Sequence, residues 1–267
     1  MVLVVFLDID GTVIGDITYQ VLEWELISTV APRKLNAFRT RLMQTLKDGM
    51  LRPNLAEFMG ASAPPQTFFF AYTASDDKWA AFLLPVIEQV IGIKFMRPIL
   101  SRKNCSFQIN TFTKSLSLAC RSVHPKIKKE YPKISLSQLE KNCLLIDNNN
   151  TLVESRSKCV TCPTYHYIHP TNVLTLLSED EIHDRLGDII PILEKYGFTE
   201  MGSHSSLRMF YSAYYLKLAK LFKAHHQSPP SKDDFWLKAA GVMNHLVRKD
   251  VLTRDHLIRG LSAVIST

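Results

Sequence analysis

The sequence predicts an α/β fold, in which helices flank a parallel sheet and a small helical module follows at the C-terminus. Three short apolar runs, at residues 2–7, 67–71 and 143–146, have the length and composition of buried strands. Between them the apolar residues repeat at helical spacing, and strands that alternate with helices indicate a parallel sheet. We therefore expect one domain over residues 1–200 and a helical module over residues 201–267.

The first apolar run is expected to be a buried strand rather than a targeting segment. It covers only Val2 to Leu7, no basic region precedes it, and it runs directly into Asp8. A signal peptide or a membrane span requires a longer apolar stretch.

Two helices are predicted within the α/β part. Residues 35–46 carry Leu and Phe on one helical face, and Gly49 provides a stop. A second helix begins at Ser75 with Asp76 and Asp77, because acidic residues favour the positive end of the helix dipole, and it ends at Gly92.

The C-terminal part is expected to form an accessory module. A turn at residues 228–231 separates an aromatic-rich segment from a helix at residues 233–248. We expect a chain that ends near residue 203 to retain turnover of a small substrate. The aromatic stripe is interpreted as core, and it comprises Phe210, Tyr211, Tyr214, Tyr215, Leu218 and Phe222.

The cysteines and the charge restrict the compartment and the partners. An odd set of five cysteines without framework spacing is typical of a reducing compartment, which favours cytoplasm or nucleus. A zinc site is an alternative use of Cys159 and Cys162 with His166 and His169. The net charge is +7, and segments 121–141 and 204–267 carry its largest shares.

Such basic segments attract phosphorylated proteins, nucleic acid or acidic surfaces alike, or they are simply solvated helical faces. The charge therefore restricts the class of partner without choosing one.

Two aspartates follow the first predicted strand, in the sequence LDIDGT at residues 7–12. Ligands of α/β sheets bind at the carboxyl ends of the strands, and residues two apart point the same way. Asp8 would attack phosphorus, while Asp10 would protonate the leaving oxygen and later activate water. Gly11 allows a sharp turn, and the hydroxyl of Thr12 could hold the loop.

Further polar residues could supply the cations and donors that an anionic substrate requires beside two aspartates. Thr73 and Ala74 follow the second strand, where a hydroxyl and the amides of a helix start could bind phosphate oxygens. Lys114 could neutralise developing charge. Asp147 and Asn148 follow the third strand and offer oxygen ligands that suit Mg²⁺.

This ordered set resembles the four signature motifs of the haloacid dehalogenase (HAD) superfamily. The Asp147-Asn148 pair is similar to that of one branch, the NLI-interacting-factor-like phosphatases, which include the phosphatases of the RNA polymerase II tail (CTD). The resemblance spans about residues 3–195, although Gly11 and a helical reading of residues 16–47 depart from the branch. Its other landmarks lie at residues 51–58, 72–75, 101–105, 113–117 and 146–148.

The resemblance implies an HAD-like fold, Mg²⁺ as cofactor and a role for each residue. Asp8 is the implied nucleophile and Asp10 the acid and base, and Lys114 stabilises the phosphoryl group. The implied phosphate ligands are Thr12, Thr73, Ala74 and Arg102, and the implied metal ligands are Asp8, Asp10, Asp147 and Asn148, with Asp147 orienting either Lys114 or the metal.

Three functions are compatible with these observations. The leading hypothesis, from the resemblance, is a phosphoserine or phosphothreonine protein phosphatase. A phosphatase of nucleic-acid ends is the second, since the basic segments could follow a nucleic-acid backbone. The third is a scaffold protein, of a host or of a large DNA virus, that keeps the fold with an idle site.

Overall fold

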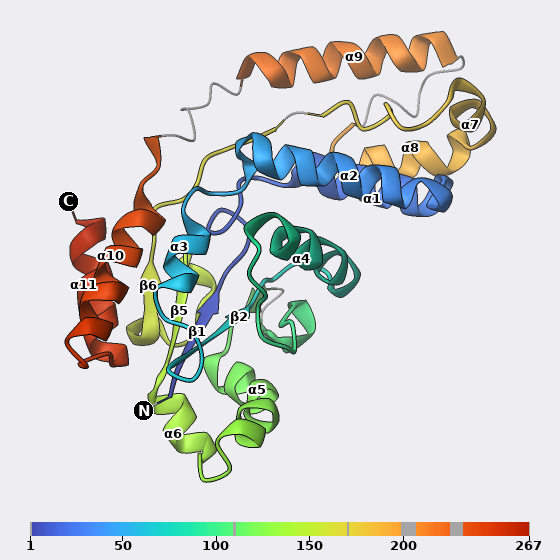
Figure 1. The fold of residues 1–267 in the computed structure, drawn as a ribbon. Coiled ribbons are helices and arrows are strands. Elements are labelled where there is room, and N and C mark those ends of the chain that lie inside the picture. The colour runs from blue at the N-terminus through green and yellow to red at the C-terminus, as the bar shows by residue number, and fades with distance from the viewer. Residues whose placement is uncertain (1, 109–110, 170, 199–206, 225–231, 267) are drawn as a thin grey trace. The chain divides into compact units, whose positions relative to one another are not determined.

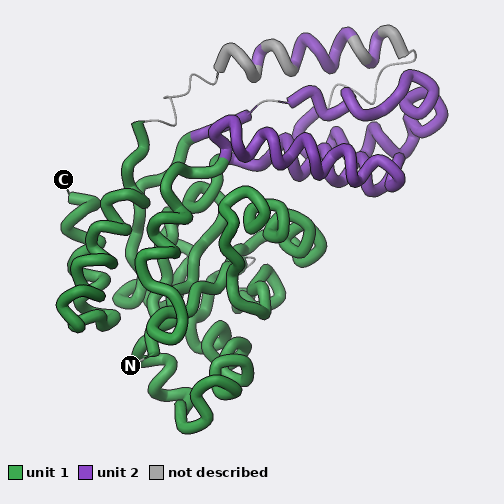
Figure 2. Tube along the Cα trace, viewed as in Figure 1, with its two compact units in different colours: residues 1–15, 51–166, 229–267 green, residues 16–50, 167–228 purple. Residues whose placement is uncertain are grey.

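The computed structural model describes residues 2–108, 111–169, 171–198, 207–224 and 232–266 (Figure 1). The chain forms two compact units, and neither follows the division at residue 200 that the sequence analysis expects. Unit 1 comprises residues 1–15, 51–166 and 229–267, and unit 2 comprises residues 16–50 and 167–228 (Figure 2).

Unit 1 is built on a four-stranded parallel sheet with the strand order β2-β1-β5-β6. The three predicted strands are confirmed as β1 (Leu3–Leu7), β2 (Thr67–Ala71) and β5 (Cys143–Asp147), and each is buried along its whole length. The fourth strand, β6 (Cys159–Thr161), was not predicted. Strands that are buried throughout indicate a sheet with both faces covered.

Helices α5 (Leu116–Glu130) and α6 (Leu136–Lys141) cover one face of this sheet. Side chains alternate between the faces along each strand, so every second residue of β1 and β2 points towards these helices. The resulting core includes Val4, Phe6, Phe68, Phe70, Leu145, Ala119, Val123, Ile127 and Leu139.

The opposite face carries α3 (Leu55–Gly60) and the C-terminal helices α10 (Phe235–Arg248) and α11 (Arg254–Ile265). The ring centroid of Phe58 lies 5.6 Å from that of Phe69 in β2 and 4.8 Å from that of Trp236 in α10. Helix α11 contacts β5 and β6. The end of the chain therefore belongs to the unit that holds the sheet.

The remaining elements of unit 1 follow β2. Helix α4 (Asp77–Ile91) begins and ends as predicted, because Asp76 accepts the Lys78 N–H at 2.8 Å and Gly92 adopts a φ of 72°. A hairpin of β3 (Ser106–Gln108) and β4 (Thr111–Thr113) then leads to Lys114. The short helical turns of unit 1 are Arg102–Asn104, Asn150–Leu152 and Arg156–Lys158.

Unit 2 is helical. The helical prediction for residues 16–47 is confirmed by α1 and α2, and α2 runs into an irregular turn at Leu46–Met50 where Gly49 has a φ of 118°. Its elements are α1 (Thr18–Val30), the turn Pro32–Lys34, α2 (Leu35–Thr45), α7 (Glu179–Asp184), α8 (Leu186–Lys195) and α9 (Leu207–Ala224).

The aromatic stripe of α9 is core in part. Phe210 and Tyr214 are fully buried, and the Tyr214 hydroxyl accepts the Val173 N–H at 3.0 Å. Tyr215, by contrast, is half exposed. The side chains of Tyr211, Leu218 and Phe222, and the turn predicted at residues 228–231, lie outside the described residues. None of the helices that the structure describes combines the length and the apolar character needed to cross a bilayer.

Candidate active site at the carboxyl edge of the sheet

Three predicted residues from distant parts of the sequence meet in a buried ion cluster. Asp8 directly follows β1 and Asp147 ends β5, and Lys114 donates from Nζ to Asp8 Oδ1 and, at 2.7 Å, to Asp147 Oδ2. All three side chains are buried. The lysine backbone is fixed by the Leu152 carbonyl, which accepts its N–H at 2.7 Å, and by the Glu154 N–H, which donates to its carbonyl at 3.1 Å.

Two hydroxyl groups position Asp10. Thr73 Oγ1 donates to Asp10 Oδ2 at 3.1 Å, and Ser75 Oγ donates to the same oxygen at 2.8 Å. The Ser75 N–H donates to Thr73 Oγ1 at 3.0 Å, which fixes the loop after β2. Ser75 was expected only at the start of a helix and not in the site, although its spacing of two residues from Thr73 was a usable signal.

Thr12 and Asn148 connect the loop after β1 to the loop after β5. The Asn148 N–H donates to Thr12 Oγ1 at 2.9 Å, and the Thr12 hydroxyl lies 3.1 Å from Asp8 Oδ2 and 3.2 Å from Asn148 Oδ1. Asn148 Nδ2 donates to Thr164 Oγ1 at 3.2 Å. This hydrogen bond turns the amide oxygen of Asn148 towards Thr12 and Asp8.

Gly11 makes this close approach possible. Its φ is +76°, a conformation that residues with a Cβ rarely adopt, and a Cβ at this position would lie 2.7 Å from Asn148 Nδ2. Glycine at this position therefore has a local reason, since the Asn148 side chain fills the space that a Cβ would occupy.

Arg102 lies beside the loop that carries Thr73. Its Nε donates to the Ala74 carbonyl at 2.9 Å, and its guanidinium carbon lies 5.1 Å from the ring centroid of Phe112. Arg102 is exposed, and stacking on Phe112 restrains it.

The cluster has an excess of negative charge. The pKa of Asp8 is raised to about 7, mainly by burial and also by the neighbouring Asp147 and Asp10, although the Lys114 ammonium opposes this shift. Burial by itself would lower the pKa of Lys114, but Asp8 and Asp147 outweigh it and raise that pKa. With all groups ionised, three carboxylates face one ammonium, and a divalent cation would balance the remaining charge.

The donor set fits a magnesium ion. Asp8 Oδ2 and Asn148 Oδ1 both lie by the Thr12 hydroxyl, and they are hard oxygen ligands of the kind that Mg²⁺ prefers. Both oxygens of Asp147 already accept hydrogen bonds, Oδ2 from Lys114 and Oδ1 from the Asn149 N–H at 2.7 Å.

The zinc alternative gains no support. In the part of the chain that the structure describes, no three or more His, Cys, Asp or Glu side chains gather in an arrangement that suits a metal ion. Cys159 and Cys162, with His166 and His169, were the residues considered for this alternative to ordinary thiols.

Arg52 links the loop after β1 to helix α10, and it is 1% exposed. Its Nε and Nη2 donate to the two carboxylate oxygens of Asp233, each at 2.9 Å. Nη1 donates to the Pro163 carbonyl at 2.9 Å and lies 3.5 Å from the Thr12 carbonyl oxygen. The guanidinium also stacks over Phe235, 4.6 Å from its ring centroid. The sequence marks Arg52 as unusual, since it is a basic residue in an apolar segment. It does not indicate the partner of Arg52, because Asp233 lies 181 positions away.

A buried Asp-Lys-Asp cluster lies at the carboxyl edge of a parallel sheet, as the resemblance to HAD phosphatases predicts. Residues 3–187 match the family of NLI interacting factor-like phosphatases, and the chain belongs to this family. The family expected from the sequence motifs is thereby confirmed, and with it a phosphatase enzyme.

Two solved structures are similar to the chain over 99% of its length. One is Fcp1, described as an essential RNA polymerase II CTD phosphatase, with 14% identity, 69% of that chain covered and a TM-score of 0.37. The other is a variant of fission yeast Fcp1 bound to beryllium fluoride, with 12% identity, 70% of that chain covered and a TM-score of 0.38. No curated protein matches the chain.

Proposed function

We propose that the protein hydrolyses phosphomonoesters through an aspartyl-phosphate on Asp8, and that its substrates are phosphoserine or phosphothreonine proteins. The observation that carries this proposal is the contact of Lys114 with both Asp8 and Asp147 at the carboxyl edge of the sheet. A carboxylate nucleophile beside a fixed ammonium can meet a phosphoryl group whose charge that ammonium offsets.

In the first step a carboxylate oxygen of Asp8 attacks phosphorus. The bond from phosphorus to the serine or threonine oxygen breaks, and the carboxyl group of Asp10 gives its proton to that oxygen. Hydrogen bonds from Thr73 and Ser75 hold Asp10 in place for this transfer.

In the second step Asp10, now ionised, removes a proton from a water molecule. The resulting hydroxide attacks phosphorus, the bond from phosphorus to Asp8 breaks, and inorganic phosphate leaves while both side chains return to their starting forms. The phosphoryl oxygens would be contacted by the residues expected from the sequence, which are Lys114, Thr12, Thr73, the Ala74 amide and Arg102.

Asp8, the Asp10 carbonyl and Asn148 would hold Mg²⁺. The ion supplies positive charge to the phosphoryl oxygens when it is bound. We assign Asp147 to the orientation of Lys114 rather than to the metal shell, because both of its oxygens accept other hydrogen bonds.

An aryl phosphate tests the chemistry. Asp8→Asn should lower its turnover in Mg²⁺ by at least about a thousandfold without unfolding the protein, since the attacking charge is lost. Asp10→Asn should accumulate a phosphoenzyme that hydroxylamine cleaves. The aryl leaving group departs without a general acid, so the phosphoenzyme still forms, whereas hydrolysis of the phosphoenzyme needs Asp10 as a base. The exposed Asp180→Asn is the matched control. Wild-type turnover by Asp8→Asn would reject the nucleophile.

A panel of phosphopeptides and phospho-oligonucleotides tests the substrate class. Preferential turnover of phosphoserine and phosphothreonine peptides supports the proposal. Preferential turnover of oligonucleotides that falls steeply with salt would instead indicate a phosphatase of nucleic-acid ends. A folded protein that turns over neither panel nor the aryl phosphate would indicate an idle scaffold.

A further inference from the structure

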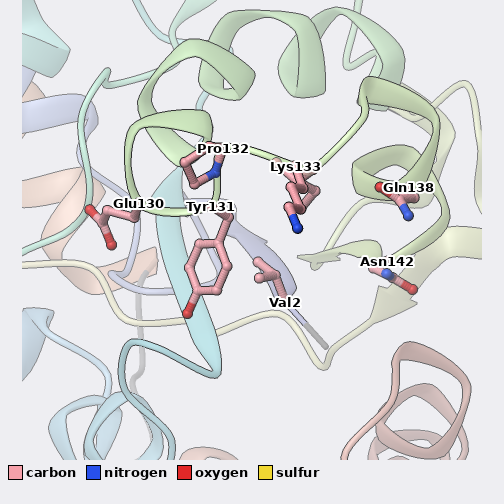
Figure 3. A pocket seen from close by; sticks show the side chains of 8 residues that line it. Val2, Glu130, Tyr131, Pro132, Lys133, Gln138 and Asn142 are labelled. Atoms are coloured by element: carbon pink, nitrogen blue, oxygen red, sulfur yellow. The ribbon is translucent and has the colours of Figure 1, made fainter.

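A cavity of about 520 Å³ opens in unit 1 between the start of β1 and the segment that joins α5 to β5 (Figure 3). Val2, Tyr131, Pro132 and Ile134 give it an apolar lining, and its polar lining consists of Glu130, Lys133, Gln138 and Asn142. The side chains of Val2, Tyr131 and Lys133 border the same space in Figure 3.

This cavity is separate from the catalytic cluster. Val2 precedes β1 and Asp8 follows it, so the two residues lie at opposite edges of the sheet. Six residues of extended strand span roughly 20 Å. A ligand in the cavity therefore does not touch the reacting phosphoryl group.

Hydrogen bonds fix the cavity wall. The Tyr131 hydroxyl donates to the Pro65 carbonyl at 2.7 Å, and His124 Nε2 lies 3.0 Å from the Ile134 carbonyl oxygen. Ser135 and Gln138 form a reciprocal capping box at the start of α6. A wall that is already ordered loses little conformational entropy when a partner binds.

The segment that supplies most of the cavity lining is basic. Residues 121–141 contain six basic and two acidic residues, which gives a net charge of +4. Glu130 is matched by Lys126 at 3.6 Å. The other five basic residues are exposed, and no described carboxylate forms an ion pair with them; they are Arg121, Lys128, Lys129, Lys133 and Lys141.

We propose that the cavity and the basic residues of segment 121–141 form a groove that docks an acidic peptide segment, which inserts one apolar side chain into the cavity. The apolar lining selects the anchor, Lys133 in the lining selects an acidic residue beside it, and the other unpaired cations of the segment attract further acidic residues. The inference rests on the proposed function in one respect, because it makes the segment a second contact of the phosphoprotein substrate. An oligonucleotide could use the positive charge but has no aliphatic side chain for the cavity.

Direct binding tests the groove without any catalysis. The probe is a fluorescein-labelled, unphosphorylated peptide with a single Leu among Glu residues, measured by anisotropy against full-length protein. Lys133→Glu should weaken its binding at least tenfold, whereas Lys47→Glu, an exposed lysine of unit 2, should not. Exchanging the peptide's Leu for Ser should weaken binding by a similar factor. Equal binding to both variants, or no dependence on Leu, would overturn the proposal, as would equal competition by an oligonucleotide of the same charge.

Bipartite substrates test the link to catalysis. The acidic segment is joined to a phosphoserine through two or ten residues, which span at most about 7 or about 35 Å. Only the longer linker can bridge the two sites, so it alone should lower KM about tenfold or more, with kcat unchanged. Lys133→Glu should remove this advantage and leave aryl phosphate turnover unaffected. A KM that is the same for both linker lengths would reject docking of the substrate. Absence of turnover of every substrate, with peptide binding intact, would reject only the proposed function.

Discussion

Replacing Asp233 with Asn removes the negative charge that faces Arg52 while it keeps the shape of the side chain. Arg52 is 1% exposed, and the carboxylate of Asp233 binds it through two parallel hydrogen bonds of 2.9 Å. The variant would therefore leave a buried guanidinium without its counterion.

The expected loss of stability follows from the burial of both partners. Breaking a buried ion pair costs about 3–5 kcal/mol. The Asp233 side chain is 21% exposed, so water partly replaces it, and we expect a loss of about 2–3 kcal/mol in the free energy of unfolding. For a unit of this size that loss corresponds to a shift of the urea midpoint by about 1 M.

Urea unfolding followed by tryptophan fluorescence measures this effect, because Trp79 and Trp236 are both buried in unit 1. Asp234→Asn is the matched control, since its side chain is 56% exposed and pairs at 3.3 Å with Lys238 on the surface. It should cost less than about 0.5 kcal/mol. Equal midpoints for the two variants would refute the view that the pair of Arg52 and Asp233 fixes the start of α10 to the loop after β1.

Four further outcomes are expected. A chain that ends at residue 203 should aggregate and lose aryl phosphate turnover, contrary to the accessory role expected from the sequence, because it removes α10 and α11 from one face of the sheet; a monodisperse, active truncation would contradict this. Gly11→Ala should lower turnover at least tenfold without changing the fold, since the alanine Cβ displaces the Asn148 side chain. Unchanged kinetics would show that the Asn148 side chain can take another position without loss of activity. Chelation of divalent cations should abolish turnover and Mg²⁺ should restore it, whereas full activity in chelator would exclude a required metal. The hydrogen bond from Lys34 helps to lower the pKa of Glu181 to about 2. The ionised Glu181 therefore stabilises the fold fully above its unfolded pKa of about 4.3, and this stabilisation is lost as the pH falls towards 2. Thermal melts of Glu181→Gln should lack this part of the pH dependence.

The catalytic cluster was open to prediction because strand ends have a fixed position in a parallel sheet. Once residues 2–7 and 143–146 are recognised as neighbouring buried strands, Asp8 and Asp147 must emerge at the same edge. The hydroxyl of Thr12 is then within reach of the second loop. Topology thus accounts for the two aspartates, whereas the contact of Lys114 with Asp147 was implied only by the family resemblance and the contact of Thr12 with Asn148 was not predicted.

Other contacts had no local signal. The apolar face of α10 predicts that it packs on something, but periodicity does not say which surface it covers. Its partner Phe58 lies in a short helix far away in the sequence, and Asp233 looks like any solvated acid beside a helix start. The expected boundary at residue 200 failed for the same reason, since a change from mixed to purely helical pattern does not reveal which segments share a core.

The discontinuity of unit 1 has a consequence for the order in which the chain can fold during synthesis. The ribosome releases β1 first, its neighbour β5 more than 130 residues later, and α11, which contacts β5 and β6, near residue 265. Contacts between such distant segments form slowly, because long loops must close before any contact compensates for the lost entropy. Until α10 and α11 emerge, one apolar face of the nascent sheet is only partly covered, and exposed apolar surface is what chaperones bind.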